Sequence, residues 1–270
     1  MNPTEQGDKA HALRLDVLGA GPAFTDRIGS AGAAYLVRSG GDSLLLDLGQ
    51  GAFPRLAATI EPSSLSAVLV SHLHPDHFVD LVPLRHYLRY DLQPPRRVRV
   101  IGPAGLADRL DALHGQPGFC AESLEMHPIP AGSQAIGSFR IESRPVAHSA
   151  DSHAFRVSVG SGPGLVYSGD SASTDDLSPL VSEGDTLLVE VSFGIGPVPP
   201  GAMHFNAAMV SALIERTRPG HVLLTHILRG SDRAATVAAV QDGYDGLVEL
   251  VAPGFQTTVR PRESQGPERG

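Results

Sequence analysis

One short segment constrains the fold of this chain more than any other. Ser71–Leu81, SHLHPDHFVDL, follows the apolar run Ala67–Val70 and gathers several metal-ligand side chains in one place. They are His72, His74, Asp76 and His77. Alternate side chains of a strand share one face, so His72 and His74 are predicted to point the same way, and a loop leading into a helix would turn the other two towards a neighbouring point.

This spacing predicts two adjacent metal sites. Imidazole nitrogen and carboxylate oxygen are the ligands that borderline divalent metals prefer, and two ions about 3.5 Å apart can share a bridging hydroxide. The alternative is a histidine-rich surface turn. A single H-x-H would favour that alternative, but four ligand-type residues after a buried strand favour a metal site.

The run HLHPDH resembles the HxHxDH signature of the metallo-β-lactamase fold, a superfamily of mostly binuclear metallohydrolases. Further elements follow in the family order, from Leu13 to about Val259. They are Asp47 in LLLDLGQG, His148 in PVAHSADSHAFRV, Asp170 in LVYSGDS and His226 in VLLTHIL. The resemblance therefore covers nearly the whole chain and implies a two-metal hydrolase.

The resemblance also implies a role for each of these residues. His72, His74 and His148 would hold the first ion, Asp76, His77 and His226 the second, and Asp170 would bridge the two. The carboxylate of Asp47 would support the metal-binding loop from behind its ligands. Two divalent ions are expected as cofactors, with Zn²⁺ the default for these ligands, although Mn²⁺ or Fe²⁺ also fits.

A proton donor is expected beside the metal site. Ribonuclease Z-like members of the superfamily pair a histidine with a glutamate, and EVSF with Glu190 and AMHFNAA with His204 stand at the matching points. A carboxylate raises the pKa of an imidazole, so a protonated nitrogen could be offered to a departing alkoxide. Asp76, His204 and Glu190 are accordingly the predicted catalytic residues. The threonine that follows the histidine in the family is missing here, and a packed loop histidine is the alternative.

The length and composition favour a single large core. The chain has 270 residues, of which 41% are hydrophobic and 19% charged. Residues 13–260 are predicted to form one α/β (α+β) domain, with a disordered tail at 1–12 and a polar tail at 261–270. The resemblance implies a four-layer αββα sandwich. The polar N-terminus and the lack of a long apolar run predict a cytoplasmic protein without a membrane span.

Local patterns predict most of the elements. Gly40-Gly41 marks a hairpin between two strands, and Asn206–Thr217 has helical spacing. A helix over Asp76–Tyr90 is expected to kink near Pro83, and another over Ala104–His114 to start at Pro103. Their predicted inward residues are Val79, Val82 and Leu88 in the first helix and Leu106, Leu110 and Leu113 in the second. Gly115–Gly137 is expected to be an irregular flap over the site.

The charge and the chain length between motifs bear on the substrate. The net charge is −8, which is not typical of a protein that grips nucleic acid along much of its surface. Only Ser149–Gly169 separates His148 from Asp170, which leaves no space for the basic arm with which ribonuclease Z holds tRNA. Nucleic acid is therefore not the expected partner. The pattern looks most like the small phosphodiesterase branch, which includes atypical cyclic-nucleotide phosphodiesterases.

A small phosphodiester, with a 3′,5′-cyclic nucleotide as the leading candidate, is the expected substrate. A ribonuclease Z-like RNA endonuclease and a thiolester or lactone hydrolase are alternatives, because the same hydroxide attacks carbonyl and phosphoryl groups. A non-catalytic metal-binding scaffold ranks last, since the ligand set is complete. The lone Cys120 excludes an internal disulfide and a thiolate metal cluster. Relatives in the superfamily are commonly dimers, so a homodimer is expected.

Overall fold

Two mixed sheets form the centre of the molecule. The computed structural model describes residues 12–25 and 27–259. The first seven-stranded sheet has the order β14 (Gln256–Thr258), β1 (Arg14–Gly19), β2 (Ala34–Ser39), β3 (Asp42–Leu46), β4 (Ala67–Leu69), β5 (Val98–Gly102) and β6 (Leu124–Pro128). The second has the order β13 (Leu247–Leu250), β12 (His221–Thr225), β11 (Thr186–Glu190), β10 (Leu165–Tyr167), β9 (His153–Ser158), β8 (Phe139–Pro145) and β7 (Gly132–Ile136).

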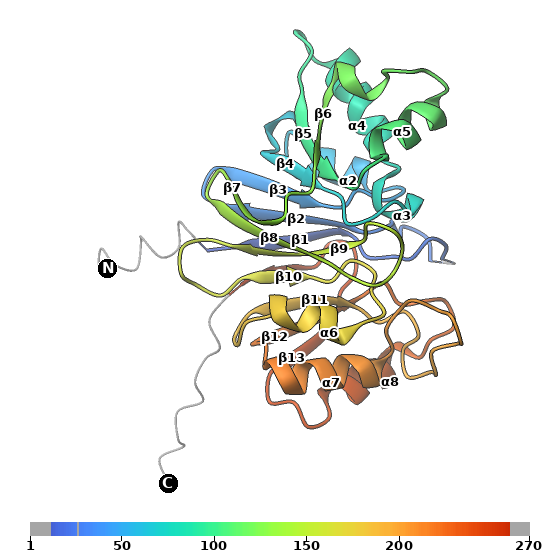
Figure 1. The fold of residues 1–270 in the computed structure, drawn as a ribbon, viewed down its shortest axis with the longest axis vertical. Helices are drawn as coiled ribbons and strands as arrows, with labels where there is room; N and C mark the ends of the chain where they lie inside the picture. Colours follow the sequence, from blue (N-terminus) through green and yellow to red (C-terminus); the bar gives the residue numbers. More distant parts are fainter. Residues whose placement is uncertain (1–11, 26, 260–270) are drawn as a thin grey trace.

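Helices cover the outer faces of both sheets (Figure 1). Beside the first sheet lie α2 (Phe53–Thr59), α3 (Pro75–Phe78), α4 (Leu81–His86), the π-helical turn Tyr87–Asp91 and α5 (Leu106–His114). Beside the second lie α6 (Thr174–Leu177), α7 (Ala207–Thr217) and α8 (Arg233–Gln241). Single 3₁₀ turns occupy Pro62–Ser64, Cys120–Glu122 and Ser178–Leu180.

Three clusters of buried apolar side chains hold the two sheets and the two layers of helices together. In β3, Leu44 and Leu46 enter the cluster between the sheets, whereas Leu45 enters the cluster under the helices of the first sheet. A third cluster lies between the second sheet and its helices and includes Val189 and Val210. Strands buried on both faces need apolar residues at successive positions, which explains runs such as LLL in β3. The predicted four-layer αββα sandwich is confirmed.

Strand direction brings the sequence motifs to one edge of the sandwich. In the first sheet β3, β4 and β5 are parallel, and β1 runs the same way because it is antiparallel to β2. In the second sheet β10 to β13 are parallel, and β8 shares their direction because both it and β10 are antiparallel to β9. Loops after the carboxyl ends of such strands are where open α/β sheets bind ligands.

Several local predictions are confirmed. The hairpin at Gly40-Gly41 joins β2 to β3, and Gly40 has a positive φ of 58°, which glycine adopts without strain. The helix predicted to end at Thr217 is α7, which begins after Asn206, whose side chain accepts a hydrogen bond from the backbone N of Met209. Cys120 is buried and unpaired.

Other local predictions are wrong in detail. The helix expected over Asp76–Tyr90, with a break or kink near Pro83, is divided at Val79-Asp80, about one turn before the proline, which itself lies in the first turn of α4. Leu88 is buried as predicted, but Val79 and Val82 are only half-buried, and Leu81 and Leu84 are buried instead. Shifting the break changes which residues face the sheet.

The helix α5 ends at His114 as predicted but differs from its prediction at its start and in one inward residue. It begins at Leu106 after Gly105, so Pro103 lies before it. Leu106 and Leu110 are buried, but Leu113 is 58% exposed, because the last turn extends past the packed face.

The flap predicted over Gly115–Gly137 is wrong. This stretch contains a 3₁₀ turn and the strands β6 and β7. β6 pairs with β5 and β7 pairs with β8, so they form the outer strands of the two sheets. Proline and glycine at their ends concealed the strand pattern. The sequence reasoning also missed α8, which packs against α7 and β13.

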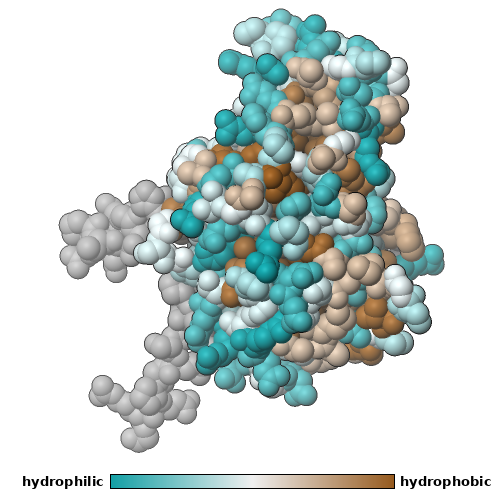
Figure 2. Space-filling view, in the orientation of Figure 1, coloured by the Kyte–Doolittle hydropathy of each residue, from teal (hydrophilic) through white to brown (hydrophobic). Residues whose placement is uncertain are grey.

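Polar side chains are interspersed with apolar ones on the face of the molecule shown in Figure 2. Across residues 12–25 and 27–259, no helix has both the length and the apolar character that crossing a membrane requires. The tails predicted at 1–12 and 261–270 lie outside the described residues, apart from Ala12.

Candidate metal centre

Seven side chains from both sheets converge at one edge. They are His72, His74, Asp76, His77, His148, Asp170 and His226, the full set that the sequence predicted as metal ligands. β4 ends at Leu69, so His72 and His74 lie in the loop after the strand and not on one strand face, which corrects that expectation. Asp76 and His77 belong to the single-turn helix α3, which starts at Pro75.

The first cluster consists of three imidazoles and one carboxylate. The Nδ1 atom of His74 lies 3.0 Å from Nε2 of His72 and 3.0 Å from Nε2 of His148. The Oδ2 atom of Asp170 lies 3.7 Å from the Nε2 atoms of both His72 and His148. Four ligand atoms at these separations can surround one ion.

The second cluster shares the same carboxylate. Oδ2 of Asp170 lies 3.4 Å from Nε2 of His77 and 3.6 Å from Nε2 of His226. Oδ2 of Asp76 lies 3.7 Å from Nε2 of His77 and 3.3 Å from Nε2 of His226. Asp170 therefore stands between the two clusters, where a carboxylate can bridge two ions.

Buried polar atoms without partners mark the centre as a cation site. Nε2 of His77 and Oδ1 of Asp170 are buried and have no hydrogen-bond partner among the described residues. Leaving such atoms unsatisfied is costly, and a divalent ion would satisfy both. The donor set of imidazole and carboxylate therefore fits divalent metal ions.

The protonation states separate the two clusters. Burial lowers the pKa of His72 well below its ordinary value and also lowers those of His74 and His148. These imidazoles are therefore neutral, as metal ligands must be. Burial opposes the charged form of His77 as well, but the charges of Asp170 and Asp47 raise the pKa of His77 well above its ordinary value. The second cluster thus holds protons that a metal would displace.

Hydrogen bonds behind the ligands aim their free nitrogens at the centre. Nδ1 of His148 donates to the carbonyl of Met203 at 2.7 Å, and Nδ1 of His226 lies 3.1 Å from Oγ of Ser192. With Nδ1 engaged, Nε2 of each ring keeps its lone pair for a metal. The sequence reasoning missed Ser192 and Met203, which carry no motif of their own.

Asp47 is the main support behind the second cluster. Its Oδ2 accepts hydrogen bonds from Nδ1 of His77 at 2.7 Å, from the hydroxyl of Tyr167 at 2.6 Å and from the hydroxyl of Ser71 at 2.7 Å. Its φ of 59° lies in the left-handed region, where backbone strain often accompanies a functional role. These contacts fit the supporting role expected for Asp47.

Close packing of backbone holds the metal-binding turn. A Cβ atom on Gly49 would lie 1.8 Å from the carbonyl oxygen of Asp76, so only glycine fits at this position. The backbone N of Gly49 donates to Ala33, and that of Ala33 donates to the same Asp76 oxygen. The LLLDLGQG motif therefore positions α3 through its glycine as well as through Asp47.

The predicted proton-donating pair is in contact. Nδ1 of His204 lies 2.9 Å from Oε1 of Glu190 and 3.8 Å from Oδ2 of Asp170. Burial would lower the pKa of His204, but the hydrogen bond and charge of Glu190 raise it above the ordinary value. Glu190 is 1% exposed and also accepts from the backbone N of Phe205, so its position is fixed.

His204 keeps one nitrogen available. Its side chain is 24% exposed, and its Nε2 has no hydrogen-bond partner within the described part of the chain. Two other described histidines have side-chain partners of their own: Nδ1 of His153 bonds to the carbonyl of Asp151, and the ring of His114 stacks on Phe119.

The fold and the convergent ligands define the class of a metallo-hydrolase. A family model described as "Beta-lactamase superfamily domain" matches residues 44–227. The chain is 30% identical to the uncharacterized protein ML1173 of Mycobacterium leprae, over 95% of this chain and 90% of that one. The chain therefore belongs to the β-lactamase superfamily.

Other relatives share the fold. Probable metallo-hydrolase YhfI of Bacillus subtilis is 24% identical, and its crystal structure superposes with a TM-score of 0.81 over 91% of this chain and 99% of that one. A ribonuclease Z of Mycobacterium bovis is 29% identical over 93% of this chain and 99% of its own. A diphosphatase from the PhnP family superposes with a TM-score of 0.70 at 17% identity, over 91% and 97% of the two chains.

Proposed function

We propose that this protein is a metal-dependent phosphodiesterase that cleaves a small phosphodiester, with a 3′,5′-cyclic nucleotide as the leading candidate. The observation that carries the proposal is the contact between His204 and Glu190 beside Asp170. A phosphodiester with an alkoxide leaving group needs a proton as its P–O bond breaks. A protonated imidazole at the rim of the metal centre supplies that proton.

The ligand residues define where the reaction takes place. His72, His74 and His148 would hold one ion, Asp76, His77 and His226 the other, and Asp170 both. Two divalent ions held there would acidify a water molecule and offset the negative charge that develops on the phosphoryl oxygens. Zn²⁺ is the proposed metal, because imidazole and carboxylate are its common ligands.

His204 would act on the leaving group. Glu190 holds Nδ1 and favours the protonated ring, which leaves the proton on Nε2 for the leaving group. Once His204 gives this proton to the departing oxygen, its partial exposure lets it take another from solvent. Asp76 would serve as a metal ligand and would also orient the attacking water.

The connections between strands favour a small substrate. β8, β9 and β10 follow one another through Val146–Ser152 and Val159–Gly164, without an inserted arm. The RNA endonuclease alternative draws on the ribonuclease Z relative, and the lactone alternative on the shared chemistry. A homodimer and a cytoplasmic location remain expectations.

The first test measures hydrolysis of 3′,5′-cyclic AMP and of bis(p-nitrophenyl) phosphate by protein reconstituted with Zn²⁺ or Mn²⁺. Asp170→Ala protein is the blank. Turnover of both substrates is expected. Turnover of the activated diester alone would support two-metal chemistry and contradict the cyclic nucleotide, and short RNA and lactones would be assayed next. Wild-type protein with two bound ions and no turnover on any of these would contradict the proposal.

A further inference from the structure

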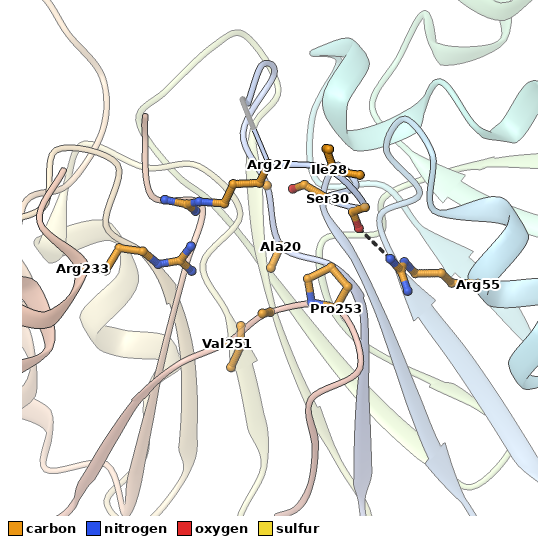
Figure 3. Close-up of a pocket in the computed structure, with 11 residues that line it drawn as sticks. Ala20, Arg27, Ile28, Ser30, Arg55, Arg233, Val251 and Pro253 are labelled. Carbon is orange, nitrogen blue, oxygen red and sulfur yellow. Dashed lines mark hydrogen bonds between the residues drawn. The ribbon is translucent and has the colours of Figure 1, made fainter. Parts of the chain in front are cut away.

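A cavity lined by three arginines lies close to the metal centre. It has a volume of about 300 Å³, and Arg27, Arg55 and Arg233 contribute to its wall. They come from the loop after β1, from α2 and from the start of α8. Figure 3 shows Arg27 and Arg233 side by side, with Arg55 across the cavity beyond Pro253. We call this cavity the arginine pocket.

The arginine pocket brings together three positively charged side chains. Among the described residues, no carboxylate forms an ion pair with any of its three guanidinium groups. Arg55 donates to the carbonyl of Gly29 at 2.6 Å, which leaves its charge uncompensated. Burial and the nearby charge of Arg27 lower the pKa of Arg233. Like charges this close repel, so an anion between them would stabilise the arrangement.

This charge contrasts with the rest of the molecule. The chain carries a net charge of −8, and several of its other arginines meet carboxylates. Arg38 lies 2.7 Å from Asp16, Arg156 lies 2.8 Å from Asp185, and Arg216 lies 2.7 Å from Asp175. The arginine pocket instead gathers three arginines around one cavity in a chain that is acidic as a whole.

The pocket lies at the edge that carries the metal centre. Its wall includes Ala20 after the carboxyl end of β1 and Val251 after that of β13. The carbonyl of Ala20 accepts a hydrogen bond from the backbone N of His226 at 3.1 Å. One wall of the arginine pocket is thus bonded directly to a predicted ligand of the second ion.

We propose that the arginine pocket binds a phosphate group of the substrate that is separate from the phosphodiester being cleaved. This inference rests on the proposed function and adds to it a preference for phosphodiesters that carry a second phosphate over those, such as 3′,5′-cyclic AMP, that carry one. Guanidinium groups bind phosphate oxygens in pairs through their planar donor fork. Arg27 and Arg233 lie near enough for their charges to affect each other, so their two forks suit the oxygens of one terminal phosphate.

The test compares two substrates that differ only in this second phosphate. They are the dinucleotide ApA and its 5′-phosphorylated form pApA, each with one cleavable diester. Wild-type protein should cleave pApA with a kcat/KM about tenfold higher, since charged hydrogen bonds of this kind are worth about one such factor. In Arg27→Gln/Arg233→Gln protein the ratio should fall to about one. Both side chains are partly solvent-accessible, so the variant is expected to fold.

Arg140→Gln is the matched control, because Arg140 is a 62% exposed arginine near the opposite end of β8. It should keep the wild-type ratio. A wild-type ratio of about one, or a double variant that retains the wild-type ratio, would overturn the proposal.

Titration with inorganic phosphate distinguishes a site for the second phosphate of a substrate from a site for a free anion. In calorimetric titration of the metal-loaded protein, the double variant should lose one phosphate site that the wild type and Arg140→Gln retain. Loss of that site together with a substrate ratio of about one in the wild type would overturn the assignment to substrate. If neither dinucleotide is cleaved, the proposed function fails on these substrates, and identical titrations of wild type and double variant would overturn the pocket itself.

Discussion

The metal centre and the arginine pocket share one edge of the sandwich and differ in almost every physical property. Most side chains of the metal centre are buried, although His74 is exposed, and the centre is built around the carboxylates of Asp76, Asp170 and Asp47, which need cations. The arginine pocket is partly open and holds three guanidinium groups that need an anion. The two sites meet at the bond between Ala20 and His226.

Because of this difference, we assign the reaction to the metal centre and the choice among substrates to the arginine pocket. A centre whose ligands are mostly buried and held by hydrogen bonds can hold ions at fixed distances. A half-open cluster of long side chains tolerates more variation and can select among substrates at little cost to the fold. The reaction should therefore depend on the first site and the preference for substrates on the second.

The largest effect should come from Asp170→Ala. Loss of the shared carboxylate removes a ligand from both ions, so hydrolysis of every substrate should be abolished and bound metal should decrease. Elemental analysis and turnover of bis(p-nitrophenyl) phosphate measure the two effects. Asp175→Ala, at an aspartate whose side chain is 83% exposed, is the control. Wild-type turnover in Asp170→Ala would remove the bridging role.

His204→Ala should distinguish leaving groups. Esters with poor alkoxide leaving groups should lose about 10²- to 10⁴-fold in rate, whereas nitrophenyl esters, which need little protonation, should lose far less. Steady-state kinetics on both kinds of ester give the comparison, and His153→Ala is the matched histidine control. Equal losses on both esters would show that His204 is not the acid.

Metal removal should destabilise the metal centre without affecting the arginine pocket. At a metal concentration about a hundredfold above Kd, binding contributes about 2.7 kcal/mol, so chelation should lower the Tm by about 5–10 °C near neutral pH. The raised pKa values of His77 and His226 mean that protons compete with metal as the pH falls.

The direction in which pH changes the stabilising effect of metal follows from this competition between protons and metal. Protonated His77 and His226 stabilise the metal-free protein at low pH, and this contribution is lost as the pH rises through their raised folded-state pKa values. The Tm difference between metal-loaded and metal-free protein should therefore shrink below about pH 6.5, the ordinary imidazole value. Thermal melts across pH 5–8 would measure it. A difference that grows on acidification would contradict the assigned protonation states.

A higher salt concentration should give the smallest change in activity, and it should act through the arginine pocket alone. The Debye length falls from about 10 Å at 0.1 M salt to 3 Å at 1 M, so a partly exposed cationic site is screened while a buried centre is not. The pApA preference should fall a few-fold between these concentrations, with ApA nearly unchanged. Equal salt effects on both substrates would contradict the proposed division of roles between the metal centre and the arginine pocket.

Much of the metal centre was predictable from local sequence. HLHPDH places four ligands close together in the chain, in a loop and the helix that follows it, so little tertiary information is needed to group them. Asp47, His148, Asp170 and His226 each follow an apolar run, and parallel strands bring such positions to one edge. The supports were harder to predict, because Tyr167 and Ser192 look like ordinary strand and loop residues.

The errors in the predicted fold have a common cause. Leu113 kept the helical spacing, but spacing does not indicate where the neighbouring layer ends. β6 and β7 are outer strands, each with a strand neighbour on only one side, so their pattern is weak and irregular. α8 is a small-residue helix whose apolar stripe is too short to stand out.

The sequence by itself determined the chemistry of the ligands and most of the strands that carry them, because these depend on residue type and short-range periodicity, and its resemblance to the metallo-β-lactamase fold implied the class of fold. Only the tertiary structure decided that Arg27, Arg55 and Arg233 line one cavity. They lie far apart in the chain and carry no shared motif, and their meeting depends on how β1 and β13 end beside each other. Local sequence contains no record of that proximity, because packing between the two sheets creates it.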